Sequence, residues 1–140
     1  MPPSSPSSGA GMHAVDTNVI VRCLTRDDVR QSPIAREFID RHDVLVLSTV
    51  LIECEWVMRG VHRLPPAEIA ALIRQFAGLP TVSIEQPQIV AQALDWFEQG
   101  MDFADALHLA SSDDCEAFVT FDRKLATVAR KAKAGKVKAL

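Results

Sequence analysis

Apolar residues alternate along the chain between short runs typical of buried strands and longer segments with helical spacing. The pattern predicts strands at residues 12–15, 44–47, 82–84 and 117–121, with an edge strand at 137–140. It predicts helices at residues 17–24, 32–42, 48–61, from Pro65 past Phe76, and at 89–100, 103–113 and 125–133. Strands that alternate with helices imply right-handed βαβ units. We therefore expect an α/β fold with a mostly parallel central sheet of four to five strands, sandwiched by helices.

Polar residues before the apolar segments predict how some of these helices begin. Ser32 precedes Pro33, and this pair is typical of an N-cap followed by proline at the first helical position. Ser48 or Thr49 is expected to cap the helix that follows the second strand.

Length and composition favour one folded domain. Residues 1–11 are mostly Pro, Ser, Gly and Ala, so we expect a disordered N-terminal extension there and a folded domain at residues 12–140. No apolar run approaches the roughly 18 residues of a membrane span, and the start lacks the pattern of a secretion signal. Three dispersed cysteines, Cys23, Cys54 and Cys115, predict buried free thiols, and so a cytoplasmic protein.

Charge is unevenly distributed, although the formal net charge is only −3. Every charged residue after Asp122 is Lys or Arg, and Arg22, Arg26 and Arg30 form a second basic group. These cations can be ordinary solvated side chains, or they can surround an acidic pocket and bind phosphates.

Four acids fall where strands end or helices begin. Asp16 follows the first strand, Asp122 follows the fourth, Glu53 lies in the second turn of a helix, and Asp105 lies in the first turn of another. Ligands of α/β sheets bind at the carboxyl ends of the strands. Carboxylates gathered there repel one another unless a cation neutralises them, and such oxygen ligands suit Mg²⁺ or Mn²⁺. We therefore expect a metal site.

Each acid also has a structural interpretation. We expect Glu53 to point inward, since it shares a helical stripe with Val50 and Val57, whereas Glu55 is expected to be a surface charge. An inward carboxylate can instead form a salt bridge to an arginine. The alternatives for the others are a helix cap for Asp16 and Asp102 and a turn for Asp122.

Four sequence blocks, in this order, resemble a PIN domain, and among PIN proteins a VapC-type toxin of a bacterial toxin–antitoxin pair. The blocks are Val15-Asp16-Thr17-Asn18-Val19-Ile20, Leu51-Ile52-Glu53, Asp102-Phe103-Ala104-Asp105-Ala106-Leu107 and Val119-Thr120-Phe121-Asp122. The resemblance covers about residues 12–140. It implies an acidic metal site of Asp16, Glu53, Asp105 and Asp122, with Asp102 as a further acid.

The resemblance further implies an Mg²⁺- or Mn²⁺-dependent endoribonuclease, the toxin of a type II pair. It implies a homodimer neutralised by a VapB-type antitoxin. Thr17, Asn18 and Thr120 are candidates for supporting the acids, although Thr17 and Asn18 also suit helix capping. His108 lies near Asp105, but a core histidine is the simpler interpretation.

Two other classes of protein compete with a nuclease. A signalling receiver also has an acidic Mg²⁺ site, but it needs an acidic pair after the first strand and a lysine after a late one. Asp16-Thr17-Asn18 offers one acid, and residues 119–122 contain no lysine. A catalytically silent RNA- or protein-binding module with this fold would keep the same sequence pattern, so it stays an alternative.

Overall fold

The computed structural model describes residues 11–140. The predicted disordered extension therefore lies outside the described residues, apart from Gly11. The chain divides into two compact units, one ending at Glu85 and one formed by Gln86–Leu140, and each is described by itself. Within the described residues, no helix is both long and apolar enough to cross a membrane.

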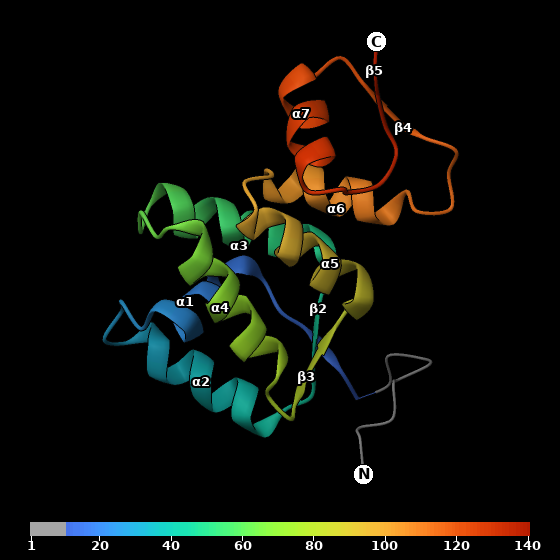
Figure 1. The fold of residues 1–140 in the computed structure, drawn as a ribbon. Coiled ribbons are helices and arrows are strands. Elements are labelled where there is room, and N and C mark those ends of the chain that lie inside the picture. The colour runs from blue at the N-terminus through green and yellow to red at the C-terminus, as the bar shows by residue number, and fades with distance from the viewer. Residues whose placement is uncertain (1–10) are drawn as a thin grey trace. The chain divides into compact units, whose positions relative to one another are not determined.

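The first unit combines a small parallel sheet with four helices (Figure 1). Its elements are β1 (His13–Ala14), α1 (Thr17–Thr25), α2 (Gln31–Arg41), β2 (Val44–Val46), α3 (Ser48–Gly60), α4 (Pro66–Ala77) and β3 (Val82–Ile84). The strand order is β1-β2-β3, and both pairs are parallel, with His13 opposite Val44 and Val44 opposite Val82. Helix α1 packs against α2 and α3, and α4 packs against α3 and β3. The sheet therefore carries helices on successive crossovers, as βαβ units require.

Helical spacing of large apolar side chains builds the core of this unit. Fully buried residues recur three and four positions apart in α4, at Ile69, Ile73 and Phe76. Strand β2 is buried at both Val44 and Val46, as expected for the central strand of a covered parallel sheet.

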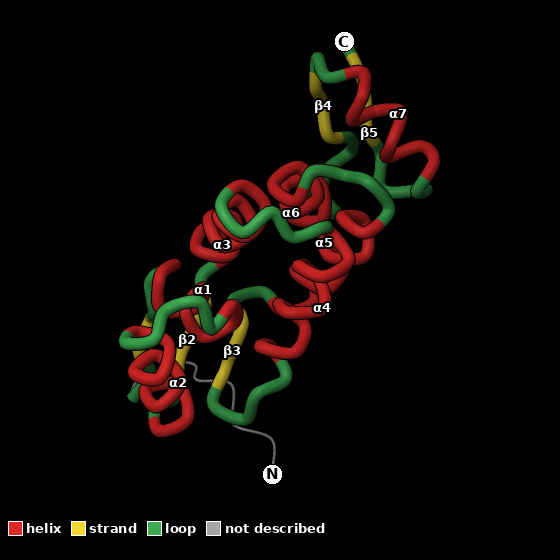
Figure 2. Tube along the Cα trace, turned by 90° about the vertical axis from the view of Figure 1, so that its left-hand side faces the viewer, coloured by secondary structure: helices red, strands yellow, loops and turns green. Residues whose placement is uncertain are grey.

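The second unit is a helical pair followed by a βαβ unit. Its elements are α5 (Pro87–Glu98), α6 (Phe103–Ser111), β4 (Phe118–Thr120), α7 (Arg123–Lys131) and β5 (Val137–Ala139). Helix α5 packs against α6, and α7 packs against β5. Strands β4 and β5 are parallel, with Val119 opposite Lys138. Both strands lie beside α7 (Figure 2). At Gly135, with φ +62°, an added Cβ would lie 2.9 Å from a methyl carbon of Leu109, so this turn requires glycine.

The predicted α/β class and parallel pairing are confirmed, but the sheet is small. The five strands of residues 11–140 lie in two sheets, of three and two strands, and each strand has only two or three residues. Strands this short offer few backbone groups for pairing, and periodicity in the sequence does not report which edges meet.

Two predicted helix caps and one predicted burial are wrong. Ser32 lies inside α2 and is buried, and the Asp28 carboxylate instead accepts the N–H groups of Arg30 and Gln31, at 2.9 and 2.7 Å. Neither Ser48 nor Thr49 caps α3, because both lie within it and Leu47 is at the N-cap position. Cys23 and Cys54 are buried free thiols as expected, whereas Cys115 is exposed.

Asp27 joins the loop after α1 to the loop after α3. Its carboxylate lies 2.7 Å from His62 Nε2, accepts the Thr25 hydroxyl at 2.8 Å and pairs with Arg22 at 3.1 Å. The hydrogen bond with His62, and then the one from Thr25, lowers the pKa of Asp27 to about 2.

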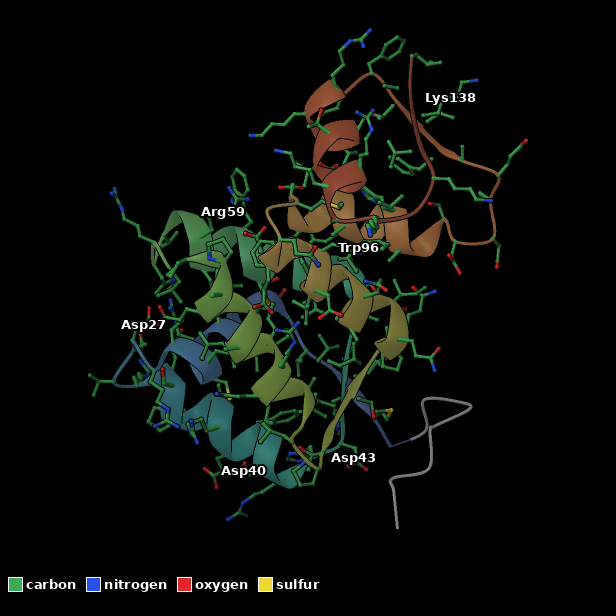
Figure 3. All side chains as sticks on the ribbon, viewed as in Figure 1. Asp27, Asp40, Asp43, Arg59, Trp96 and Lys138 are labelled. Carbon is green, nitrogen blue, oxygen red and sulfur yellow. The ribbon has the colours of Figure 1, made fainter. Side chains whose placement is uncertain are left out.

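We expect Asp27→Ala to lower the free energy of unfolding by about 1 kcal/mol at neutral pH, because the carboxylate is partly exposed and solvent screens it. A carboxyl with a lowered pKa stabilises the fold above its ordinary value of 3.8, and this contribution is lost as the pH falls towards about 2. Urea unfolding of both forms at neutral pH and below about pH 2 measures it. Asp43→Ala, at another exposed acid (Figure 3), is the control. An equal loss in both variants would contradict a specific role for Asp27.

Candidate functional site

Asp16 lies between β1 and α1 and is the N-cap of α1. Its backbone is extended, with φ −80° and ψ 164°, and its Oδ1 accepts the N–H of Thr17 at 2.8 Å. The capping interpretation therefore holds for this residue. The bond occupies one oxygen of an exposed carboxylate at a helix N-terminus, so the group can still accept other partners.

Glu53 lies near Asp16, on the neighbouring helix α3. The thiol of Cys54 donates to the carbonyl of Thr17 over 4.0 Å, so α3 meets the first residue of α1 there. Burial, and then the charges of Glu53 and Asp16, raises the pKa of Cys54 to about 12. Both carboxylates thus act on the same buried thiol, and the first unit holds two of the four predicted acids together.

The predicted inward face of α3 is wrong. Its buried residues are Leu51, Cys54, Glu55 and Met58, whereas Glu53 is exposed. The buried face of α3 differs from the predicted one because α3 packs against α1 and α4. These contacts, and not the spacing of apolar residues along the helix, decide which side chains are buried. Glu53 therefore needs no buried partner, and it is free to face a cation from solvent.

Glu55, predicted to be a surface charge, is only 3% exposed. Its Oε2 accepts Arg59 Nε at 2.6 Å, four residues along the helix. Arg59 also lies 5.3 Å above the ring of Trp56. The buried salt bridge that we considered for Glu53 is therefore found at Glu55.

The second unit brings together Asp102, Asp105 and Asp122. Asp102 is the N-cap of α6 and accepts the N–H of Asp105 at 3.1 Å, and Asp122 is the N-cap of α7 and accepts the N–H of Leu125 at 3.1 Å. Burial, and then the charges of Asp102 and Asp122, raises the pKa of the half-buried Asp105 above its ordinary value. The three acids therefore repel one another in the absence of a cation.

The supporting residues differ in what they contact. The hydroxyl of Thr120 accepts the N–H of Asp122 at 3.0 Å, so it supports the backbone at that acid. Thr17 is buried, and its hydroxyl has no hydrogen-bond partner, while Asn18 is exposed.

His108 is exposed, which contradicts its interpretation as a core histidine. Its charge lowers the pKa of Asp105, but less than the neighbouring acids raise it.

The Glu85 side chain caps the start of helix α3, which the sequence analysis did not predict. Its Oε1 accepts the N–H of Ser48 at 3.0 Å, at the start of α3. The residue directly follows β3, and this position after a strand was the available signal.

The donor chemistry of both acidic groups suits a hard divalent cation. Carboxylate oxygens are the ligands that Mg²⁺ and Mn²⁺ prefer, and a cation would relieve the repulsion that raises the pKa of Asp105. Within residues 11–140, no three His, Cys, Asp or Glu side chains form a group that could hold a metal ion. Charge effects link Asp16 and Glu53 to the same thiol in the first unit, and Asp102 and Asp122 to Asp105 in the second. That all of them serve one site stays a prediction.

The fold and its acids define a small α/β protein with carboxylates at the starts of its helices. A family model for the PIN domain matches residues 14–131, and the chain belongs to the PIN domain family. PIN domains are commonly nucleases, so membership gives the chain a nuclease-type fold. No curated protein and no solved structure matches the chain.

Proposed function

We propose that this protein is an endoribonuclease that hydrolyses RNA phosphodiester bonds with Mg²⁺ or Mn²⁺. The observation that carries the proposal is the setting of Asp105 in a PIN domain, where burial, and then the charges of Asp102 and Asp122, raises the pKa of this carboxyl. Such an arrangement costs stability in the metal-free protein, and a divalent ion would remove the cost.

Asp16, Glu53 and Asp105 are the residues proposed to hold the metal, directly or through water, and Asp122 completes the negative site. A bound Mg²⁺ or Mn²⁺ supplies an activated water and stabilises negative charge on the phosphate. Asp102 and Asp122 also fix the starts of α6 and α7 through their caps, so they orient the helices that carry the acids. Thr17, Asn18 and Thr120 support this arrangement.

We further propose the biological role of a VapC-type toxin, which forms a homodimer and is neutralised by a VapB-type antitoxin. The support is the match of the four sequence blocks around the acids, now within a confirmed PIN domain. Induced expression in a bacterial host should arrest growth, and co-expression of the adjacent small open reading frame should relieve the arrest. Growth unaffected by active enzyme would contradict the toxin role without contradicting the nuclease.

We expect saturating Mn²⁺ or Mg²⁺ to raise the melting temperature by several degrees, since a ligand at about 100 times its Kd adds about 2.7 kcal/mol to stability. Asp105→Asn should reduce this shift, whereas Asp114→Asn, at an exposed acid outside both groups, should keep it. Differential scanning fluorimetry with and without EDTA measures the shift, and a fluorescent RNA substrate measures cleavage.

The alternative is a catalytically silent RNA- or protein-binding module. The lack of a three-ligand group among residues 11–140 favours it. A protein that binds RNA but shows neither metal stabilisation nor cleavage would support this alternative and exclude the nuclease.

A further inference from the structure

Helices α1 and α3 meet at two buried residues, each of which directly follows one of the acids of the first unit. Thr17 follows Asp16 and is 6% exposed, and Cys54 follows Glu53 and is fully buried. The Cys54 thiol donates to the carbonyl oxygen of Thr17 over 4.0 Å, although the two residues are 37 positions apart in the chain. The point where the two helices touch is therefore one residue away from an acid on each of them.

The Cys54 side chain fills the space between the two helices at this point. A sulfur atom 4.0 Å from a backbone oxygen is near van der Waals contact, so no further atom fits between them. The distance between packed helices depends on the size of the side chains at the contact, and a buried cysteine behaves as a small apolar residue. The side chain at position 54 therefore sets how closely α3 approaches the first residue of α1.

Both carboxylates lie within electrostatic range of this sulfur atom. Burial, and then the charges of Glu53 and Asp16, raises the pKa of the Cys54 thiol. Asp16 is also fixed to its own helix, because its Oδ1 accepts the N–H of Thr17 at 2.8 Å. A movement of α3 away from α1 would consequently separate Glu53 from Asp16.

The backbone of Thr17, and not its hydroxyl, makes both hydrogen bonds at this contact. Its N–H donates to Asp16 and its carbonyl accepts the Cys54 thiol. Among residues 11–140, the buried hydroxyl of Thr17 has no hydrogen-bond partner. An unpaired buried hydroxyl costs stability, and an apolar group of the same shape removes that cost. Thr17→Val should therefore leave the contact intact.

We infer that Cys54 is a positioning residue of the proposed metal site, and that its side chain holds Asp16 and Glu53 at the separation a divalent cation needs. The inference rests on the proposed function for the identity of the ligand. Mg²⁺ demands near-ideal octahedral geometry, so it tolerates little movement of its ligands. Replacing a residue that orients metal ligands typically weakens metal binding by about 10–100-fold. Cys54 acts in this way through the two helices, without touching the metal.

The test measures the Kd of the full chain for Mn²⁺ by isothermal titration calorimetry. Cys54→Val adds bulk and a branch at the contact, and it should weaken Mn²⁺ binding by about ten-fold. Cys54→Ser keeps the size and the hydrogen-bond donor, so it should bind Mn²⁺ nearly as tightly as the original protein, as should Thr17→Val. If Cys54→Val does not fold, Cys54→Ala takes its place, and weaker Mn²⁺ binding is again expected.

Cys23→Val is the matched control, because Cys23 is a buried free thiol near the other end of α1. It should lower the melting temperature through overpacking, as Cys54→Val does, but keep the Kd for Mn²⁺. A purely structural role of Cys54 would lower the melting temperature and leave this Kd unchanged. The inference is overturned if folded Cys54→Val binds Mn²⁺ as tightly as the original protein.

A metal-free measurement separates this inference from the proposed function. In EDTA, Asp16→Asn and Glu53→Gln each remove one of two like charges held near each other, so their effects on the urea midpoint should not add. In the Cys54→Val background the two effects should become additive. A chain that binds no Mn²⁺ but shows this change keeps the positioning role and loses the metal site. Additive effects in the original protein would overturn the positioning role, whether or not Mn²⁺ binds.

Discussion

Asparagine at position 16 or at position 105 should lower RNA cleavage by about a thousand-fold, while the protein stays folded. Asp16→Asn keeps a side-chain oxygen that can accept the N–H of Thr17, so the start of α1 is preserved. Asp105→Asn removes the charge that Asp102 and Asp122 repel, so the metal-free protein should lose no stability. Both variants lose a negatively charged carboxylate oxygen that is proposed to bind the metal ion. Single-turnover cleavage of a fluorescent RNA in Mn²⁺ measures the effect.

The pair of variants also tests whether the acids of the two units act in one reaction. If they do, the double variant Asp16→Asn with Asp105→Asn should be no less active than either single variant, since residues that act as a unit are not additive. Asp114→Asn is the matched control and should cleave normally. Substantial cleavage by either folded single variant would show that the proposed metal site is wrong.

The second large effect is expected from Phe103→Ala, which should destabilise the protein by about 3–5 kcal/mol. The ring of Phe103 is fully buried and meets that of Phe97 edge to face, with centroids 5.5 Å apart. It is the first residue of α6, directly after Asp102 and two before Asp105. The cavity should therefore loosen the segment that positions both acids, so cleavage should fall as well. Urea unfolding followed by circular dichroism measures the loss.

Phe103→Leu is the control for this substitution, because it leaves a smaller cavity and should cost clearly less. Adding Mn²⁺ to Phe103→Ala should recover part of the stability, since the ligand favours the folded form. A variant as stable as the original protein would mean that the α5–α6 contact does not limit the stability of this unit.

The sequence by itself determined the helices, the strands and the family. Within residues 11–140, periodicity located the helices and strands to within a few residues, and the helix expected from Pro65 begins at Pro66. The four blocks around the acids resembled a PIN domain, and the family match confirms it. These features depend on residues close together in the chain, whose spacing the sequence states directly.

Only the tertiary structure decided which side chain of each element is covered. Glu55 rather than Glu53 is buried in α3, and Glu85, thirty-seven residues away, contacts the N–H of Ser48 instead of a local cap. Likewise, the strands join as sheets of three and two. Helix rotation, distant caps and strand pairing depend on contacts between segments far apart in the chain. Local spacing leaves several such contacts equally possible, and the packing of the whole core selects among them.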